Sequence, residues 1–85
     1  MDELRRRALD LVEAELERLR GLGPAGVRAL AGPATDAERG ELVVSTRVED
    51  EDERLMVLVE AWRGRRTLAT GGFAMAPDGS TTTPH

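Results

Sequence analysis

Residues 54–75, RLMVLVEAWRGRRTLATGGFAM, contain the strongest structural signal in the chain. The segment divides at Gly64-Arg65, and a two-residue loop with glycine first is typical of a type II′ turn between antiparallel strands. This turn would pair Arg63 with Arg66 and set the register of the hairpin. Both faces of the hairpin are apolar, whereas antiparallel sheets in small domains commonly leave one face to water. The segment therefore predicts a sheet that needs cover on both sides.

In that register, the side chains alternate between two faces of the hairpin. The aliphatic face is expected to carry Leu55, Val57, Val59, Ala61, Leu68, Thr70, Gly72 and Ala74. The other face is expected to carry both aromatic residues and two methionines, in the set Met56, Leu58, Trp62, Phe73 and Met75. Because aromatic and methionine side chains are enriched at partner-binding surfaces, we interpret this second set as an interface. The alternative is that a short helix and the tail cover it within one chain.

The N-terminal residues 2–20 predict a long amphipathic helix, with Asp2 at the N-cap position. Its apolar residues share one broad stripe at helical spacing: Leu4, Ala8, Leu9, Leu11, Val12, Leu16 and Leu19. A shorter helix is predicted over residues 24–31, since Pro24 fits its first position and Gly32-Pro33 would stop it. We expect the long helix to pack on the aliphatic face of the sheet.

A further strand is predicted at residues 41–48, where the side chains alternate and Arg47 falls on the same face as Trp62. Residues 49–53 are all acidic and are interpreted as a solvated connection to the hairpin. Matching the apolar faces would pair strand residues as follows: Val48 with Leu55, Val44 with Val59, and Leu42 with Ala61.

The predicted fold is a two-layer α+β domain, in which a long N-terminal helix and a short helix pack on a three-stranded antiparallel meander. One domain is expected to span residues 1–76, including a loop at 32–40. The tail over residues 77–85, rich in threonine, is expected to be loose.

The composition is that of a soluble globular domain. The 85 residues carry a net charge of −4, include no cysteine and contain no apolar run long enough to cross a bilayer. No signal-peptide pattern begins the chain, so we expect a cytoplasmic protein that does not use a membrane as partner. Lysine, asparagine, isoleucine and tyrosine are all absent. Because those residues have AT-rich codons, the pattern indicates a GC-rich bacterial genome, and the exclusive use of arginine carries no functional meaning.

The residues needed for catalysis are scarce in this chain. The single histidine is His85, and without cysteine or an internal histidine neither a nucleophilic triad nor a His/Cys metal site can form. Glu15 and Glu60 are the carboxylates that could act as an acid–base pair, although each is more simply interpreted as a marginal or arginine-paired residue. We therefore predict no enzyme activity, no metal and no cofactor.

The leading functional hypothesis is a small homodimeric protein-interaction module with an accessory or regulatory role. One alternative is a nucleic-acid-binding accessory protein that uses Arg63, Arg65 and Arg66 beside Trp62, although the negative net charge opposes this interpretation. Another is a small-ligand-binding domain with a pocket between the long helix and the sheet.

Overall fold

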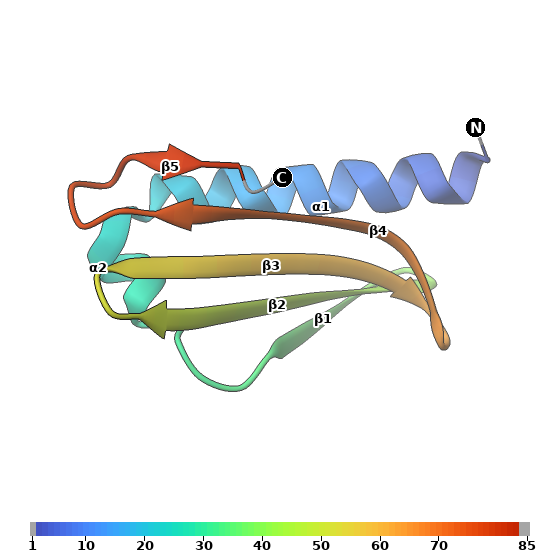
Figure 1. Cartoon of the computed structure of the whole chain (residues 1–85). Helices are drawn as coiled ribbons and strands as arrows, with labels where there is room; N and C mark the ends of the chain where they lie inside the picture. Colours follow the sequence, from blue (N-terminus) through green and yellow to red (C-terminus); the bar gives the residue numbers. More distant parts are fainter. Residues whose placement is uncertain (1, 84–85) are drawn as a thin grey trace.

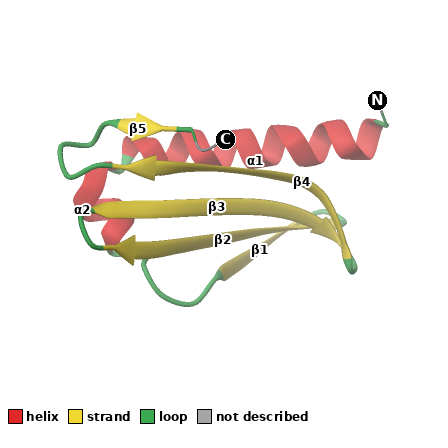
Figure 2. Ribbon diagram, in the orientation of Figure 1, coloured by secondary structure: helices red, strands yellow, loops and turns green. Residues whose placement is uncertain are grey.

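The computed structural model describes residues 2–83 and shows a helix lying along one face of an antiparallel sheet (Figure 1). The elements in chain order are α1 (Glu3–Gly21), α2 (Gly23–Arg28), β1 (Thr35–Arg39), β2 (Leu42–Glu51), β3 (Arg54–Arg63), β4 (Arg66–Met75) and β5 (Thr81–Thr82). The strands follow the order β1-β2-β3-β4-β5, and every neighbouring pair is antiparallel (Figure 2). The predicted α+β class and the helix-on-sheet arrangement are confirmed. The predicted number of strands is wrong, because the sheet has five strands instead of three.

The two additional strands come from segments that carry no strand pattern of their own. β1 is polar except for Ala37, which is half-buried opposite Val44, and it forms because a tight turn at Gly40 (φ 65°) folds it back on β2. β5 follows a turn in which Asp78 Oδ1 accepts hydrogen bonds from the Ser80 backbone N–H (2.9 Å) and hydroxyl (2.7 Å). Pairing with a stronger neighbouring strand explains both of these short elements.

Helix α1 begins and packs as its sequence predicts. The Asp2 side chain accepts a hydrogen bond from the Leu4 N–H at 3.1 Å, which satisfies one of the free donors at the helix start. The side chains of the stripe that are buried are Ala8, Val12, Leu16 and Leu19. Helix α2 has six residues and ends at Arg28, earlier than predicted, with Val27 buried in the core.

The β3–β4 hairpin has the predicted turn but a different register beyond it. Arg63 pairs with Arg66 and Trp62 with Thr67, and Gly64 has a φ of 60°, as a turn with glycine first requires. Next to this pair Ala61 opposes Ala69, so that Leu68 is an extra residue in a β-bulge. A one-residue slip moves every later side chain of the strand to the other face.

Because of the bulge, two residues that were predicted to lie at the interface point to the opposite face of the sheet. Phe73 and Met75 pair with Val57 and Leu55, and their exposures are 0% and 1%. They therefore belong to the core beneath α1, and the prediction that they share the Trp62 face is wrong. Gly71 also turns toward the helix, and a Cβ there would lie only 2.8 Å from Leu16 Cδ1. The missing side chain lets α1 approach the sheet.

The β2–β3 register differs from the prediction by two residues. Val44 pairs with Ala61 and Val48 with Val57, because the turn is the two residues Asp52-Glu53, between Glu51 and Arg54. The first of these turn residues, Asp52, has a φ of 55°. The acidic residues before it extend β2 instead of forming a longer loop. A two-residue shift preserves the faces, so the aliphatic side of β2 still points toward the helix.

Candidate interaction surface

The sheet face turned away from α1 is called the open face here. In Figure 1, α1 lies behind the sheet, and Val27 of α2 belongs to the same core cluster as the buried residues of α1. The central strand β3 places alternate residues on the open face: Met56, Leu58, Glu60 and Trp62. Leu58 is 42% exposed and Trp62 37%, while Met56 is half-buried. Within residues 2–83, no helix covers these side chains.

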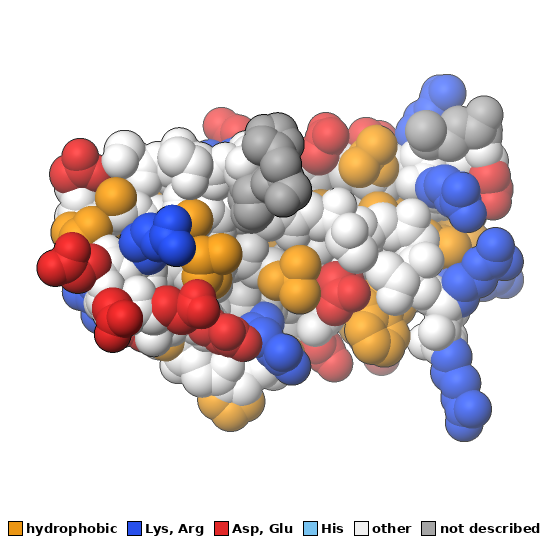
Figure 3. All heavy atoms as spheres, viewed as in Figure 1, with side chains coloured by type: hydrophobic (Ala, Val, Ile, Leu, Met, Phe, Trp, Pro, Cys, Tyr) orange, Lys and Arg blue, Asp and Glu red, His pale blue; other side chains and the backbone are white. Residues whose placement is uncertain are grey.

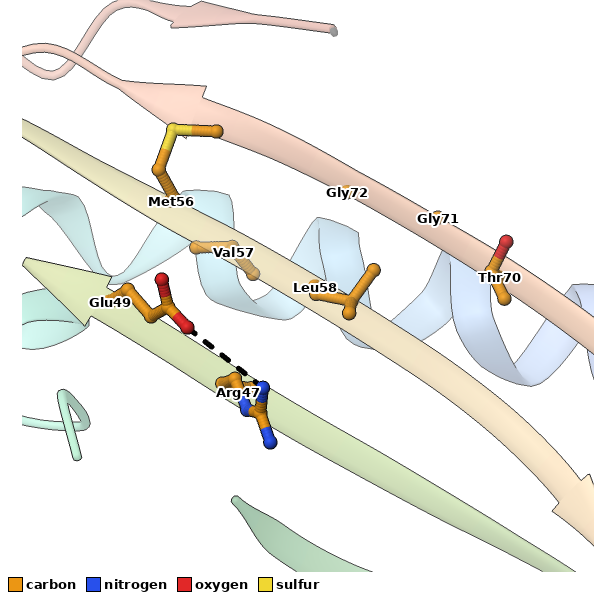
Figure 4. A pocket seen from close by; sticks show the side chains of 8 residues that line it. All are labelled: Arg47, Glu49, Met56, Val57, Leu58, Thr70, Gly71 and Gly72. Carbon is orange, nitrogen blue, oxygen red and sulfur yellow. Dashed lines mark ion pairs between the residues drawn. The ribbon is translucent and has the colours of Figure 1, made fainter. Parts of the chain in front are cut away.

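A shallow hollow of about 380 Å³ lies on this face between β2, β3 and β4 (Figure 4). It is lined by Arg47, Glu49, Met56, Val57, Leu58, Thr70, Gly71 and Gly72. Gly72 has no side chain to fill the hollow, and a Cβ at this position would lie only 2.5 Å from the Val57 carbonyl oxygen. On the β2 side, Arg47 Nη1 and Glu49 Oε1 form an ion pair at 3.9 Å. The hollow therefore combines an apolar floor with one charged wall.

Sequence reasoning placed Arg47 on this face correctly but missed Thr70 and Gly72 as neighbours of Leu58. The alternation of side chains along β2 was enough to predict the position of Arg47. The other two were assigned to the aliphatic face, because the bulge at Leu68 had no sequence signal that we recognised.

The two ends of the sheet carry opposite charge. At one end, Glu41 bridges two arginines, with Oε2 at 3.5 Å from Arg63 Nη2 and Oε1 at 3.7 Å from Arg7 Nη2. Arg65 and Arg66 are exposed at the tip of the same hairpin. At the other end, the acidic run 49–53 forms the last residues of β2 and the β2–β3 turn. Figure 3 shows most of the blue side chains at the right-hand end and a group of red ones toward the left.

The two carboxylates considered as an acid–base pair lie on opposite sides of the sheet. Glu15 accepts hydrogen bonds from Arg18 Nε (2.6 Å) and from the Thr46 hydroxyl (3.0 Å) on the helix side. Glu60 pairs with Ser45 on the open face. The Arg18 contact lowers the pKa of Glu15 from its ordinary value, partial burial opposes that shift, and the Thr46 hydroxyl adds to it. Glu15 therefore links α1 to β2 and cannot act together with Glu60.

Residues 2–83 contain no cluster of three or more His, Cys, Asp or Glu side chains able to hold a metal ion. None of the described helices combines the length and the apolar character needed to span a membrane. In comparisons with known proteins, no family model, curated protein or solved structure matches the chain. The surface of the molecule is therefore the guide to its function.

Proposed function

We propose that this chain is a protein-interaction module that forms a homodimer through its open face. The observation that carries the proposal is the exposure of Leu58 (42%) and Trp62 (37%) along the central strand, where no described element covers them. A tryptophan of this kind acts as an anchor when a partner buries it, and Leu58 adds apolar area beside it. Met56 extends the same line of apolar residues. Phe73 and Met75 take no part, because they are buried in the core.

The charges at the two ends favour a second copy as the partner. Facing sheets pack with their strands closely aligned, which allows a parallel or an antiparallel arrangement of the two copies. In the antiparallel arrangement, the acidic β2–β3 turn of each copy lies beside the basic β3–β4 turn of the other. The parallel arrangement would place like charges together. A twofold axis across the strands therefore makes the open face complementary to itself.

The mass in solution tests this proposal. Sedimentation of the wild-type protein at high micromolar concentration is expected to give a dimer, and Trp62→Arg is expected to give a folded monomer. Leu30→Arg is a matched control, because Leu30 is also 37% exposed but lies outside the open face. This control should remain dimeric. A monomeric wild-type protein, or equal effects of the two substitutions, would contradict the proposal.

A second candidate is binding of single-stranded nucleic acid at the basic turn, favoured by the exposure of Arg65 and Arg66 next to Trp62. Glu41 weighs against it by partly neutralising Arg63, as does the net charge of −4. Fluorescence anisotropy with labelled single-stranded DNA separates the candidates. Binding that weakens with salt and is lost in the double variant Arg65→Ser, Arg66→Ser would support the nucleic-acid function. Absence of binding at low salt would exclude it.

A further inference from the structure

Among the residues that the structure describes, no strand pairs with most of the outer edge of β4. β5 pairs only with Ala74 and Met75, so within residues 2–83 no strand follows β4 on this side from Arg66 to Phe73. In an antiparallel strand, the N–H and C=O of one residue point to the same side, and this side alternates along the chain. The Ala76 N–H donates to the Ser80 carbonyl, which places the backbone groups of Gly72 and Thr70 on the outer edge as well.

A groove runs along this edge between β4 and helix α1, and we call it the β4 groove. Its volume is about 370 Å³. Leu9, Val12 and Leu16 of α1 form one wall, and residues 70–72 of β4 form the other. Thr83, just after β5, also lines the groove, and β5 itself lies beside β4 (Figure 1). The groove therefore offers both a backbone edge and an apolar wall.

Nothing in the sequence of this edge discourages a further strand. β4 contains no charged residue between Arg66 and its end at Met75, and it includes two adjacent glycines. Natural proteins usually protect sheet edges with charged residues, proline or very short strands. The opposite edge follows that rule, since β1 has five residues and carries Asp36, Glu38 and Arg39. The unprotected edge of β4 is the one beside an apolar groove.

We propose that the β4 groove binds an extended peptide segment of a partner protein as a sixth strand, antiparallel to β4. Its backbone pairs with Thr70 and Gly72, and alternate apolar side chains contact Leu9 and Leu16. Of the charged residues that line the groove, Arg20 pairs with Glu17 at 4.0 Å, so Glu13 is the carboxylate that selects a segment with a basic residue. A second copy of this chain fits less well, because its β4 carries its own α1 on the same side and would bring two helices into one space. The groove shares residues 70–72 with the hollow on the open face, but its other wall is helix α1.

Hydrogen exchange followed by NMR tests the proposal directly. The probe is a blocked synthetic peptide in which valine and threonine alternate and two lysines replace threonines. In the free protein, the Thr70 and Gly72 amides should exchange fast, whereas those of Gly71 and Phe73, which face β3, should exchange slowly. Saturation with the peptide should slow exchange at Thr70 and Gly72 and leave the other two amides unchanged.

Substitutions locate the binding site. Thr70→Pro removes one outward N–H without touching the β3–β4 ladder, and it should weaken the peptide roughly five- to tenfold, as expected for one hydrogen bond. Thr70→Val keeps that N–H and should bind as the wild type does. If Thr70→Pro does not fold, the double variant Glu13→Lys, Glu17→Lys on the exposed side of α1 serves instead and should weaken the lysine-containing peptide.

Four outcomes would overturn the proposal. The first is the absence of saturable binding at millimolar peptide. The second is slow exchange at Thr70 and Gly72 in dilute protein without peptide. The third is slow exchange that appears only as the protein concentration rises, which would identify a second copy as the occupant. The fourth is undiminished binding to a folded Thr70→Pro or to the double glutamate variant.

Discussion

The adjacent residues Gly71 and Gly72 each make room for a different element of the fold. A Cβ on Gly71 would meet the Leu16 and Val12 side chains at 2.8 and 3.1 Å, while a Cβ on Gly72 would meet the Val57 backbone oxygen at 2.5 Å. A leucine methyl can move aside, but a carbonyl in the centre of a sheet cannot. The first glycine admits the helix, and the second admits the neighbouring strand.

The two alanine substitutions should therefore differ in cost. Gly72→Ala is expected to lower the free energy of unfolding by about 3 kcal/mol, and Gly71→Ala by about 1 kcal/mol. The costs differ because only the steric clash at position 71 can be relieved by a side-chain movement. Urea denaturation of both variants measures the difference. Gly21→Ala is a reference, since a Cβ at Gly21 meets nothing within 4 Å. An equal cost for Gly71→Ala and Gly72→Ala would contradict this account.

Glu15 predicts a specific dependence of stability on pH. Its pKa is lowered in the folded state, mainly by Arg18, so its contribution is present above the unfolded pKa of about 4.3 and is lost as the pH falls through the folded value. Glu15→Gln should cost about 1 kcal/mol at neutral pH, the usual size for hydrogen bonds of a partly exposed charge. The cost should shrink below about pH 4.3. Unfolding of both proteins at neutral and acid pH measures it, with the exposed Glu13→Gln as control.

At the scale of the elements, the packing of α1 is the feature that local sequence signals predict best. Leu16 is 7% exposed and lies in the core with Val12 and Leu19. Leu16→Ala should lower the free energy of unfolding by about 2–5 kcal/mol, since it leaves a cavity against Gly71. Leu30→Ala, at a site that is 37% exposed, should change it by less than about half a kcal/mol. Similar values for the two variants, measured by thermal or urea unfolding, would show that α1 is not held in this way.

The strands show where local signals fail. The turn at Gly64-Arg65 was predicted correctly because a glycine at its first position adopts the positive φ of the turn, here 60°, without steric cost. The bulge at Leu68 has no such signal, since Thr67, Leu68 and Ala69 would each fit a regular strand. The bulge brings Phe73 under the helix, where burial of a large side chain is worth roughly 1.5–3 kcal/mol. The packing of Phe73 beneath α1 therefore favours the observed register of β3 and β4.

At the scale of the whole molecule, opposite charge at the two ends makes the orientation of the proposed dimer testable. Arg65→Glu with Arg66→Glu should break the dimer by placing like charges side by side. Adding Asp50→Arg and Asp52→Arg to the same chain should restore it, because the two ends have then exchanged sign. Sedimentation measures both steps. Failure of the second pair to rescue the first, in a folded protein, would exclude the antiparallel arrangement.

Salt should affect the dimer in a related way. Raising the salt concentration should increase its dissociation constant, because exposed charges are screened beyond a Debye length of about 10 Å at 0.1 M. The double variant Asp50→Ser, Asp52→Ser should dimerise more weakly and show a smaller salt dependence. Its monomer stability should change little, although Asp50 pairs with Arg28 at 3.3 Å, since surface ion pairs contribute little. A dissociation constant that does not respond to salt would contradict the charge argument.

The sequence alone was sufficient for the features that neighbouring residues control. These are the α+β class, the helix from its Asp2 cap through its apolar stripe, and the turn between β3 and β4. Each depends on a periodicity, or on one residue whose chemistry suits a helix cap or a tight turn. The tertiary structure alone decided the bulge, the β2–β3 register, and the strands β1 and β5. These depend on which side chains fill the space beneath α1 and on which free edge a polar segment can pair with. The energies of these alternatives differ through contacts between residues that are distant in the sequence, so a local sequence pattern cannot predict which one forms.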